Sequence, residues 1–244
     1  GRDKFNHSNI YSFDYSFIKK KVVAFSQKPQ LTKGRLGCFD DCAVIPSHII
    51  IYKKKFYLYY IGWTQGKSVP YISALGLATS KNLNSCFKKV SEAPILGRTK
   101  KEPIFTASCF VQKNKKFEMW YTSNKSWSKI KNKLVPKYNI RLATSVNGID
   151  WATKNDVIKF KSKKEIAITR PWVINYKKQK IMFYSYRGKY YKIGYAIKNK
   201  TKWIRKDKKL KFYKSISKFD NKMREYGAVI KYKGKLFMFY NGNN

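Results

Sequence analysis

The chain has 244 residues, of which 43% are hydrophobic and 17% aromatic, enough apolar material for one large globular domain. No run of about 18 apolar residues occurs and no signal peptide is visible, so the sequence predicts no transmembrane helix. There are 54 Lys and Arg residues against 13 Asp and Glu residues, and a net charge of +41 attracts polyanions.

Three explanations for this charge stay open. Lys, Asn and Ile are all abundant, so nucleotide composition bias alone can have filled the surface with lysine. The charge can instead bind an acidic glycan, an anionic lipid headgroup or a cell-envelope polymer. Nucleic acid is the least favoured partner, because the lysines lie mostly in expected turns such as Lys53–Lys55 and Lys177–Lys180, not on one element.

The cysteines show no paired spacing typical of a metal site. We therefore expect no metal and no cofactor, and free thiols in a reducing, cytoplasmic compartment. The four residues are Cys38, Cys42, Cys86 and Cys109.

In chain order, residues 1–36 contain two expected strands, SNIYSFDYSF and VVAFSQ, separated by the basic turn Lys19–Lys21. Gly37–Tyr60 then predicts an apolar strand preceded by Asp40 and Asp41, followed by an aromatic strand. Alternation of aromatic and aliphatic residues after a basic turn is typical of the second strand of a hairpin.

The aromatic strand recurs along the chain. Lys54–Gly62 (KKFYLYYIG) returns as KKFEMWYTS, QKIMFYSYR and GKLFMFYNG, which aligns four tyrosines that we expect in the core: Tyr60, Tyr121, Tyr184 and Tyr240. A short apolar strand precedes each copy. A third strand follows the first three copies, and an aromatic residue then opens a fourth strand, at Phe87, Trp151 and Trp203.

A period of about 55–65 residues with four strands per unit predicts the blades of an all-β propeller. Full blades are expected at 37–95, 104–160 and 166–215, and partial blades at 1–36 and 225–244, within a single domain, 1–244. Five blades with both ends incomplete is the simplest arrangement, and closure of the two ends into a four-bladed ring is the alternative. A β-sandwich does not explain the repeat.

Inner strands surround the axis of a propeller, so polar residues at their starts predict a polar funnel. Alignment on the apolar triplets puts Asp40, Thr106, Thr169 and Glu225 in one register, and Asp41, Ala107, Arg170 and Tyr226 in the next. The ends of the second strands should face the same way, because antiparallel pairing places them beside these starts. Those ends carry Trp63, Tyr186, Arg187 and Asn241, which suit a sugar by stacking and hydrogen bonding.

Two carboxyl groups on opposite sides of a glycosidic bond can catalyse its cleavage. Asp41 or Asp40 is the candidate base or substrate anchor and Glu225 the candidate acid, while Arg170 and Glu165 are candidates for orienting the sugar. The alternatives are turn capping by the two aspartates and an ion pair of Glu225 with Arg224 or a lysine. Loops 62–73 and 123–138 are expected to be long and to carry specificity.

The segments FDDCAVIPS, ITRPWV, FYSYRG and REYGAVI resemble those of five-bladed propellers in the arabinanase, levansucrase and invertase superfamily. The resemblance covers nearly the whole chain and implies acidic catalytic residues at inner-strand starts, matching Asp40, Asp41 and Glu225. Hydrolases of that group with an Arg-Asp-Pro motif use its Asp to orient substrate, whereas this chain has Thr169-Arg170-Pro171.

Three functional hypotheses follow. The first is a glycosidase, glycoside phosphorylase or transferase that acts on a cell-surface or envelope glycan. The second is a sugar-binding propeller that cuts no bond. The third is a polyanion-binding scaffold driven by charge.

Overall fold

The computed structural model of the chain describes residues 3–5, 7–210 and 218–243. Parts of three predicted blades lie outside the described residues. These are residues 1–2 and 6 of the first partial blade, 211–215 of the third full blade and 244 of the last partial blade. Within the described part, regular structure is almost entirely β, with one 3-10 turn, Asp207–Lys209, and none of its helices is long and apolar enough to cross a membrane. The fold is therefore all-β.

Two compact units make up the chain. Unit 1 consists of Gly1–Phe117 and Ser145–Trp151, and unit 2 consists of Glu118–Thr144 and Ala152–Asn244.

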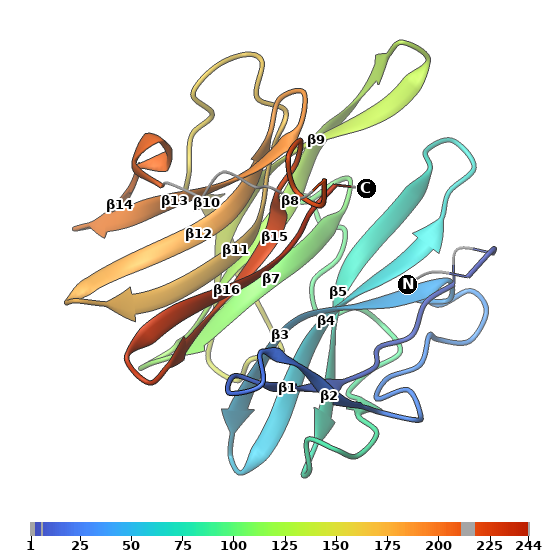
Figure 1. Ribbon diagram of the computed structural model, residues 1–244. Helices are drawn as coiled ribbons and strands as arrows, with labels where there is room; N and C mark the ends of the chain where they lie inside the picture. Colours follow the sequence, from blue (N-terminus) through green and yellow to red (C-terminus); the bar gives the residue numbers. More distant parts are fainter. Residues whose placement is uncertain (1–2, 6, 211–217, 244) are drawn as a thin grey trace. The chain divides into compact units, whose positions relative to one another are not determined.

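In unit 1, β1 (Phe13–Ser16) and β2 (Lys21–Phe25) form a two-stranded antiparallel sheet. A four-stranded antiparallel sheet follows in chain order (Figure 1). Its strands are β3 (Ala43–Tyr52), β4 (Lys55–Gln65), β5 (Tyr71–Ser80) and β6 (Lys88–Lys89). This is the arrangement of four strands that the sequence predicts between residues 37 and 95. Strand β7 (Thr106–Lys113) also belongs to unit 1.

Unit 2 repeats the arrangement. A second run of four consecutive antiparallel strands comprises β11 (Ala167–Tyr176), β12 (Gln179–Arg187), β13 (Tyr191–Asn199) and β14 (Lys202–Arg205). Strand β15 (Glu225–Tyr232) pairs with β16 (Lys235–Asn241), and Trp172 Nε1 on β11 donates a hydrogen bond to the Val229 carbonyl on β15 at 2.7 Å. Strand β8 (Phe117–Ile130), which lies in unit 2 from Glu118 onward, neighbours β9 (Lys133–Ser145), and β10 (Ala152–Asp156) pairs with β9.

The aromatic repeat forms the core, as predicted. Tyr60, Tyr121 and Tyr184 are at most 1% exposed, and the aromatic residues Phe87, Trp151 and Trp203 lie at or just before the fourth strands. Starts of first strands also face ends of second strands, because Ala43 pairs with Trp63, Ala167 with Arg187 and Glu225 with Asn241.

The predicted long loop at 123–138 is wrong. Strands β8 and β9 continue through it as a hairpin arm of 14 and 13 residues that ends in a two-residue turn (Figure 1, yellow-green). Lys131 and Asn132 have φ values of 45° and 60°, which is the backbone that a tight hairpin turn requires. The other loop is shortened to 66–70, because β4 and β5 extend into 62–73.

Lysine occupies left-handed positions in several hairpin turns. In the β11–β12 turn, Lys177 and Lys178 have φ values of 46° and 62°. Left-handed backbone costs a residue with a Cβ about 1–2 kcal/mol, and Asn-Gly is the preferred pair in such turns.

Replacing Lys177 with Asn and Lys178 with Gly is therefore expected to stabilise the protein by about 1 kcal/mol, raising Tm by about 2–4 °C. Thermal unfolding followed by circular dichroism checks this. Lys163→Asn with Lys164→Asn removes the same charge where φ is negative and serves as the control. An equal gain in both variants would attribute the effect to charge instead of backbone strain.

Candidate functional site

Asp40 is 1% exposed and carries a structural set of contacts in unit 1. Its Oδ2 accepts a hydrogen bond from the Tyr60 hydroxyl at 3.0 Å and lies 2.6 Å from Lys89 Nζ. Burial raises the pKa of Tyr60, and the Asp40 carboxylate raises it further, so this hydroxyl remains a donor.

The same combination of tyrosine, carboxylate and cation recurs twice. The Tyr184 hydroxyl donates to Asp207 at 2.6 Å beside Arg205, and the Tyr240 hydroxyl donates to Asp220 at 2.8 Å beside Arg224. At Tyr60, Tyr184 and Tyr240 the hydroxyl thus donates to a carboxylate that is itself paired with a cation. Asp40 therefore belongs to the repeated framework.

The register predicted for Asp40 and Asp41 is wrong. Tyr60, Tyr184 and Tyr240 occupy equivalent positions, so the residues that directly follow them are equivalent too. The cross-strand partners of those following residues are Ile45, Thr169 and Glu225, which therefore share one register. Asp40 and Asp41 lie five and four residues before Ile45, in the turn ahead of β3. The first inner strand is long and contains two apolar runs, and the prediction aligned the earlier one.

Asp41 caps its own turn. Its Oδ2 accepts a hydrogen bond from the Gly37 amide at 3.1 Å. Burial raises the pKa of Asp41, but hydrogen bonding with the Thr64 side chain and the Gly37 amide outweighs it, so the pKa is lowered overall. The turn-capping alternative thus describes the contacts of Asp41.

Two other candidates of unit 1 lie in the core. Trp63 is 7% exposed, and its ring stacks on Tyr71 with a centroid distance of 5.7 Å. Thr106 is fully buried, and its hydroxyl donates to the Leu96 carbonyl at 2.7 Å. Glu102, which the sequence did not single out, is also buried in this unit, at 1% exposed.

The predicted register does hold in unit 2. Arg170 and Tyr226 both have left-handed backbone, with φ values of 52° and 58°, and each lies where the strand register shifts. The Tyr226 amide donates to the buried Ser185 hydroxyl at 2.7 Å, which holds the bulge in place. Bulges re-aim side chains, and non-glycine residues with this backbone gather at functional sites.

These bulges bring together five residues that we call the arginine–tyrosine cluster. The Arg170 guanidinium lies 5.0 Å from the centre of the Tyr226 ring, and the Arg187 guanidinium lies 4.9 Å from that of Tyr191. The Tyr191 and Tyr226 rings meet edge to face at 5.7 Å. Four side chains therefore contact one another in the order Arg170, Tyr226, Tyr191 and Arg187, and Glu225 is the acidic member of the cluster.

Glu225 is 2% exposed. Burial raises its pKa, while hydrogen bonding with Tyr226 and the charges of Arg170 and Arg187 offset only part of this effect. A carboxyl group with a raised pKa retains its proton closer to neutral pH, as a general acid must.

Two candidates adjoin the cluster. Thr169 precedes Arg170 and shares a hydrogen bond of 2.8 Å with the Thr122 hydroxyl. Asn241 pairs with Glu225 across β15 and β16 and is exposed.

Glu165 and Tyr186 belong to a different set of contacts. Arg205 binds both carboxylate oxygens of Glu165, at 2.7 and 3.0 Å, and its guanidinium lies 5.1 Å from the centre of the Tyr186 ring. The same arginine pairs with Asp207. The Glu165 carboxylate is thus occupied by a structural ion pair.

Sequence reasoning missed Tyr138 and Tyr191. Their hydroxyls share a short hydrogen bond, and Tyr191 pairs directly with Arg187 across β12 and β13. The cross-strand position of Tyr191 could have been found from the hairpin register, since three residues separate it from Arg187. Tyr138 lies in the hairpin arm that was predicted as a loop, so no signal pointed to it.

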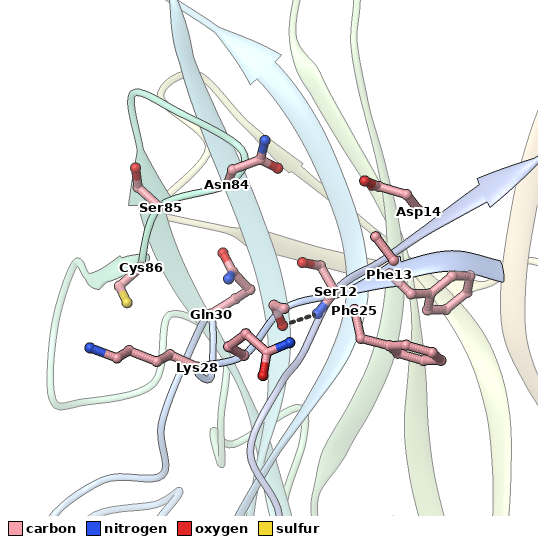
Figure 2. A pocket seen from close by; sticks show the side chains of 12 residues that line it. Ser12, Phe13, Asp14, Phe25, Lys28, Gln30, Asn84, Ser85 and Cys86 are labelled. Carbon is pink, nitrogen blue, oxygen red and sulfur yellow. Dashed lines mark hydrogen bonds between the residues drawn. The ribbon is translucent and has the colours of Figure 1, made fainter.

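The described residues of each unit also line pockets, of which one in each unit is relevant here. In unit 1 a pocket of about 510 Å³ lies beside the β1–β2 hairpin, where Phe13 and Phe25 lie together and Lys28 lies on the other side (Figure 2). In unit 2 a cleft of about 760 Å³ is strongly basic. Its charged residues are Lys154, Lys159, Lys161, Lys198, Lys202, Arg205 and Asp156.

No family model matches the chain. An uncharacterised protein of Mycobacterium tuberculosis, Rv1502, is 29% identical over 247 residues, which span all of this chain and 82% of that protein. Its counterpart in a second strain of that organism matches equally well.

Solved structures similar to this chain include glycoside hydrolases. A protein described simply as a glycoside hydrolase superposes with a TM-score of 0.70 at 18% identity, over 90% of this chain and 70% of that protein. A thermostable family-43 glycoside hydrolase gives 0.60 at 19% identity, over 80% and 64%. A Bombyx mori GH32 β-fructofuranosidase gives 0.62 at 16% identity, over 85% of this chain but only 43% of the enzyme.

These likenesses show the fold. The chain is an all-β propeller of the kind found in glycoside hydrolases of families 32 and 43. At such low sequence identity a shared fold does not carry activity with it.

Proposed function

We propose that this propeller acts on carbohydrate, in the manner of a glycoside hydrolase or a related glycosidic-bond enzyme, and that its ligand is a cell-surface or envelope glycan. The observation that carries the proposal is the arginine–tyrosine cluster. It combines a buried acid of raised pKa, two guanidinium groups and two tyrosine rings on a fold that glycoside hydrolases use.

In this proposal Glu225 gives its proton to the leaving glycosidic oxygen as the C–O bond breaks, and water, losing a proton to solvent, or phosphate forms the new bond to the anomeric carbon. Arg170 and Arg187 bind sugar oxygens, and the partly buried Tyr226 gives the sugar an aromatic surface, while the buried Tyr191 packs against the Tyr226 ring. Thr169 and Asn241 lie at the edge of the site. Asp40 and Asp41 take no step, because the register that grouped them with Glu225 is wrong and both are engaged in unit 1.

We also propose five blades. The sheets β1–β2 and β15–β16 would be the incomplete first and last blades.

A panel of oligosaccharides and polysaccharides tests the proposal. Binding is followed by calorimetry and product release by chromatography, with fructosides, arabinosides, mannosides and uronic-acid polymers in the panel. Binding of at least one saccharide, weakened by Arg170→Ala, supports the proposal. Binding without any product favours a sugar-binding propeller, and no binding across the panel overturns both.

The basic cleft of unit 2 favours one other function, a polyanion-binding scaffold. Five lysines, Arg205 and one carboxylate, Asp156, line this cleft, and of these cations Lys161 and Arg205 also pair with Asp207. Affinity for heparin-like polymers should then fall steeply with salt and should be unaffected by Arg170→Ala.

A further inference from the structure

The geometry of the arginine–tyrosine cluster points to a bound oxyanion: we propose that Arg170 and Arg187 bind a carboxylate, phosphate or sulfate group. This inference rests on the proposed function, since it makes the saccharide of that site acidic or accompanied by free phosphate.

Two donor atoms of Arg187 have no acceptor among the described residues. Its Nε and Nη2 atoms are buried, and neither donates a hydrogen bond to any described residue. A buried donor without an acceptor costs about 1–3 kcal/mol, and more when it is charged. These two atoms form one edge of the guanidinium plane, and that edge matches two oxygens of one oxyanion.

The charge in the cluster favours an anion as well. The charges of Arg170 and Arg187 both act on Glu225, whose raised pKa means that it compensates them incompletely. Arg170 and Arg187 both lie against tyrosine rings, and those rings contact each other. The two cations are therefore held in fixed places before any ligand arrives, which reduces the entropic cost of binding.

The backbone conformation of Arg170 supports the same inference. Arg170 keeps its strained left-handed conformation, with φ at 52°, where glycine would be unstrained. Pro171 directly follows it, and the bulge directs the guanidinium onto Tyr226. Strain kept at a charged residue is expected where the side chain has a binding role.

Calorimetry with four probes tests the inference: orthophosphate, sulfate, glucuronate and neutral glucose. The variants are Arg187→Lys, which keeps the charge but loses the two-pronged edge, and Arg187→Met. The control is Arg35→Lys in unit 1, whose arginine makes an exposed ion pair with Glu92. Thermal melts establish that each variant is folded.

We expect anion affinity to fall at least about tenfold in Arg187→Lys, further in Arg187→Met, and not in Arg35→Lys. Glucuronate binding more tightly than orthophosphate identifies the sugar's own anion, and orthophosphate that strengthens glucose binding identifies free phosphate. Equal affinity in wild type and Arg187→Met overturns the inference.

The two proposals fail separately. If neutral saccharides bind and lose affinity in Arg170→Ala, but no anion binds at the cluster or changes their affinity, the oxyanion inference is wrong and the proposed function stands. If no saccharide and no anion binds at the cluster, both are wrong.

Discussion

Glu225→Gln is expected to lower kcat on the best glycoside substrate by a factor of about 10² to 10⁴, with little change in substrate binding. Glutamine keeps the shape of the side chain but has no proton to give to the leaving oxygen. Steady-state kinetics with chromatographic detection of product measures this. Glu118→Gln, which breaks a partly exposed contact with Lys180 in the same unit, is the matched control. Unchanged turnover in Glu225→Gln would remove Glu225 from the chemistry.

The same variant gives a pH test that needs no substrate. Because burial raises the folded-state pKa of Glu225 above its unfolded value, the unfolded chain releases this proton at a lower pH than the folded chain. The stability that this group contributes is therefore complete below the unfolded pKa and is lost as pH rises through the folded pKa. Glu225→Gln should melt above wild type at pH 7 to 8 and match it near pH 4. A variant that is less stable than wild type at neutral pH would contradict the raised pKa.

Asp40→Ala is expected to destabilise the protein by about 3 kcal/mol, lowering Tm by about 6–12 °C. The substitution leaves Lys89, whose side chain is only 20% exposed, without its carboxylate, and leaves the buried Tyr60 hydroxyl without its acceptor. Denaturant unfolding measures the loss of free energy.

A surface pair supplies the control for Asp40→Ala. Glu92→Ala breaks the ion pair with Arg35, in which both side chains are well exposed, so it should cost less than about 1 kcal/mol. The double variant Asp40→Leu with Lys89→Met should recover much of the loss, because it removes both buried charges together. If Asp40→Ala costs no more than Glu92→Ala but abolishes sugar binding, Asp40 belongs to the site and not to the framework.

The hairpin repeat could be predicted because it depends on local patterns. Alternating aromatic residues and basic turns define β4, β12 and β16 within a few residues, and the pairing of Glu225 with Asn241 follows from the hairpin register. Where a strand holds two apolar runs, as β3 does, the pattern does not decide which run aligns. That is why Asp40 and Asp41 were placed beside Glu225.

The rest of the site depends on contacts between distant segments. The carboxylates that receive the core tyrosine hydroxyls do not all come from one place in the repeat. Asp40 and Asp220 lie five residues before the equivalent positions Ile45 and Glu225, whereas Asp207 follows a fourth strand. An alignment of repeats therefore could not place Asp207. The left-handed backbone of Arg170 and the contact between Tyr191 and Tyr226 likewise depend on the fold and not on local sequence.

A crystal structure of Glu225→Gln with the tightest-binding saccharide of the panel tests the central proposal most directly. The account predicts the sugar against the Tyr226 ring, with an anionic group within hydrogen-bond distance of Arg187 Nε and Nη2. A saccharide bound in the basic cleft of unit 2 or beside Phe13 and Phe25, with none at the arginine–tyrosine cluster, would contradict it.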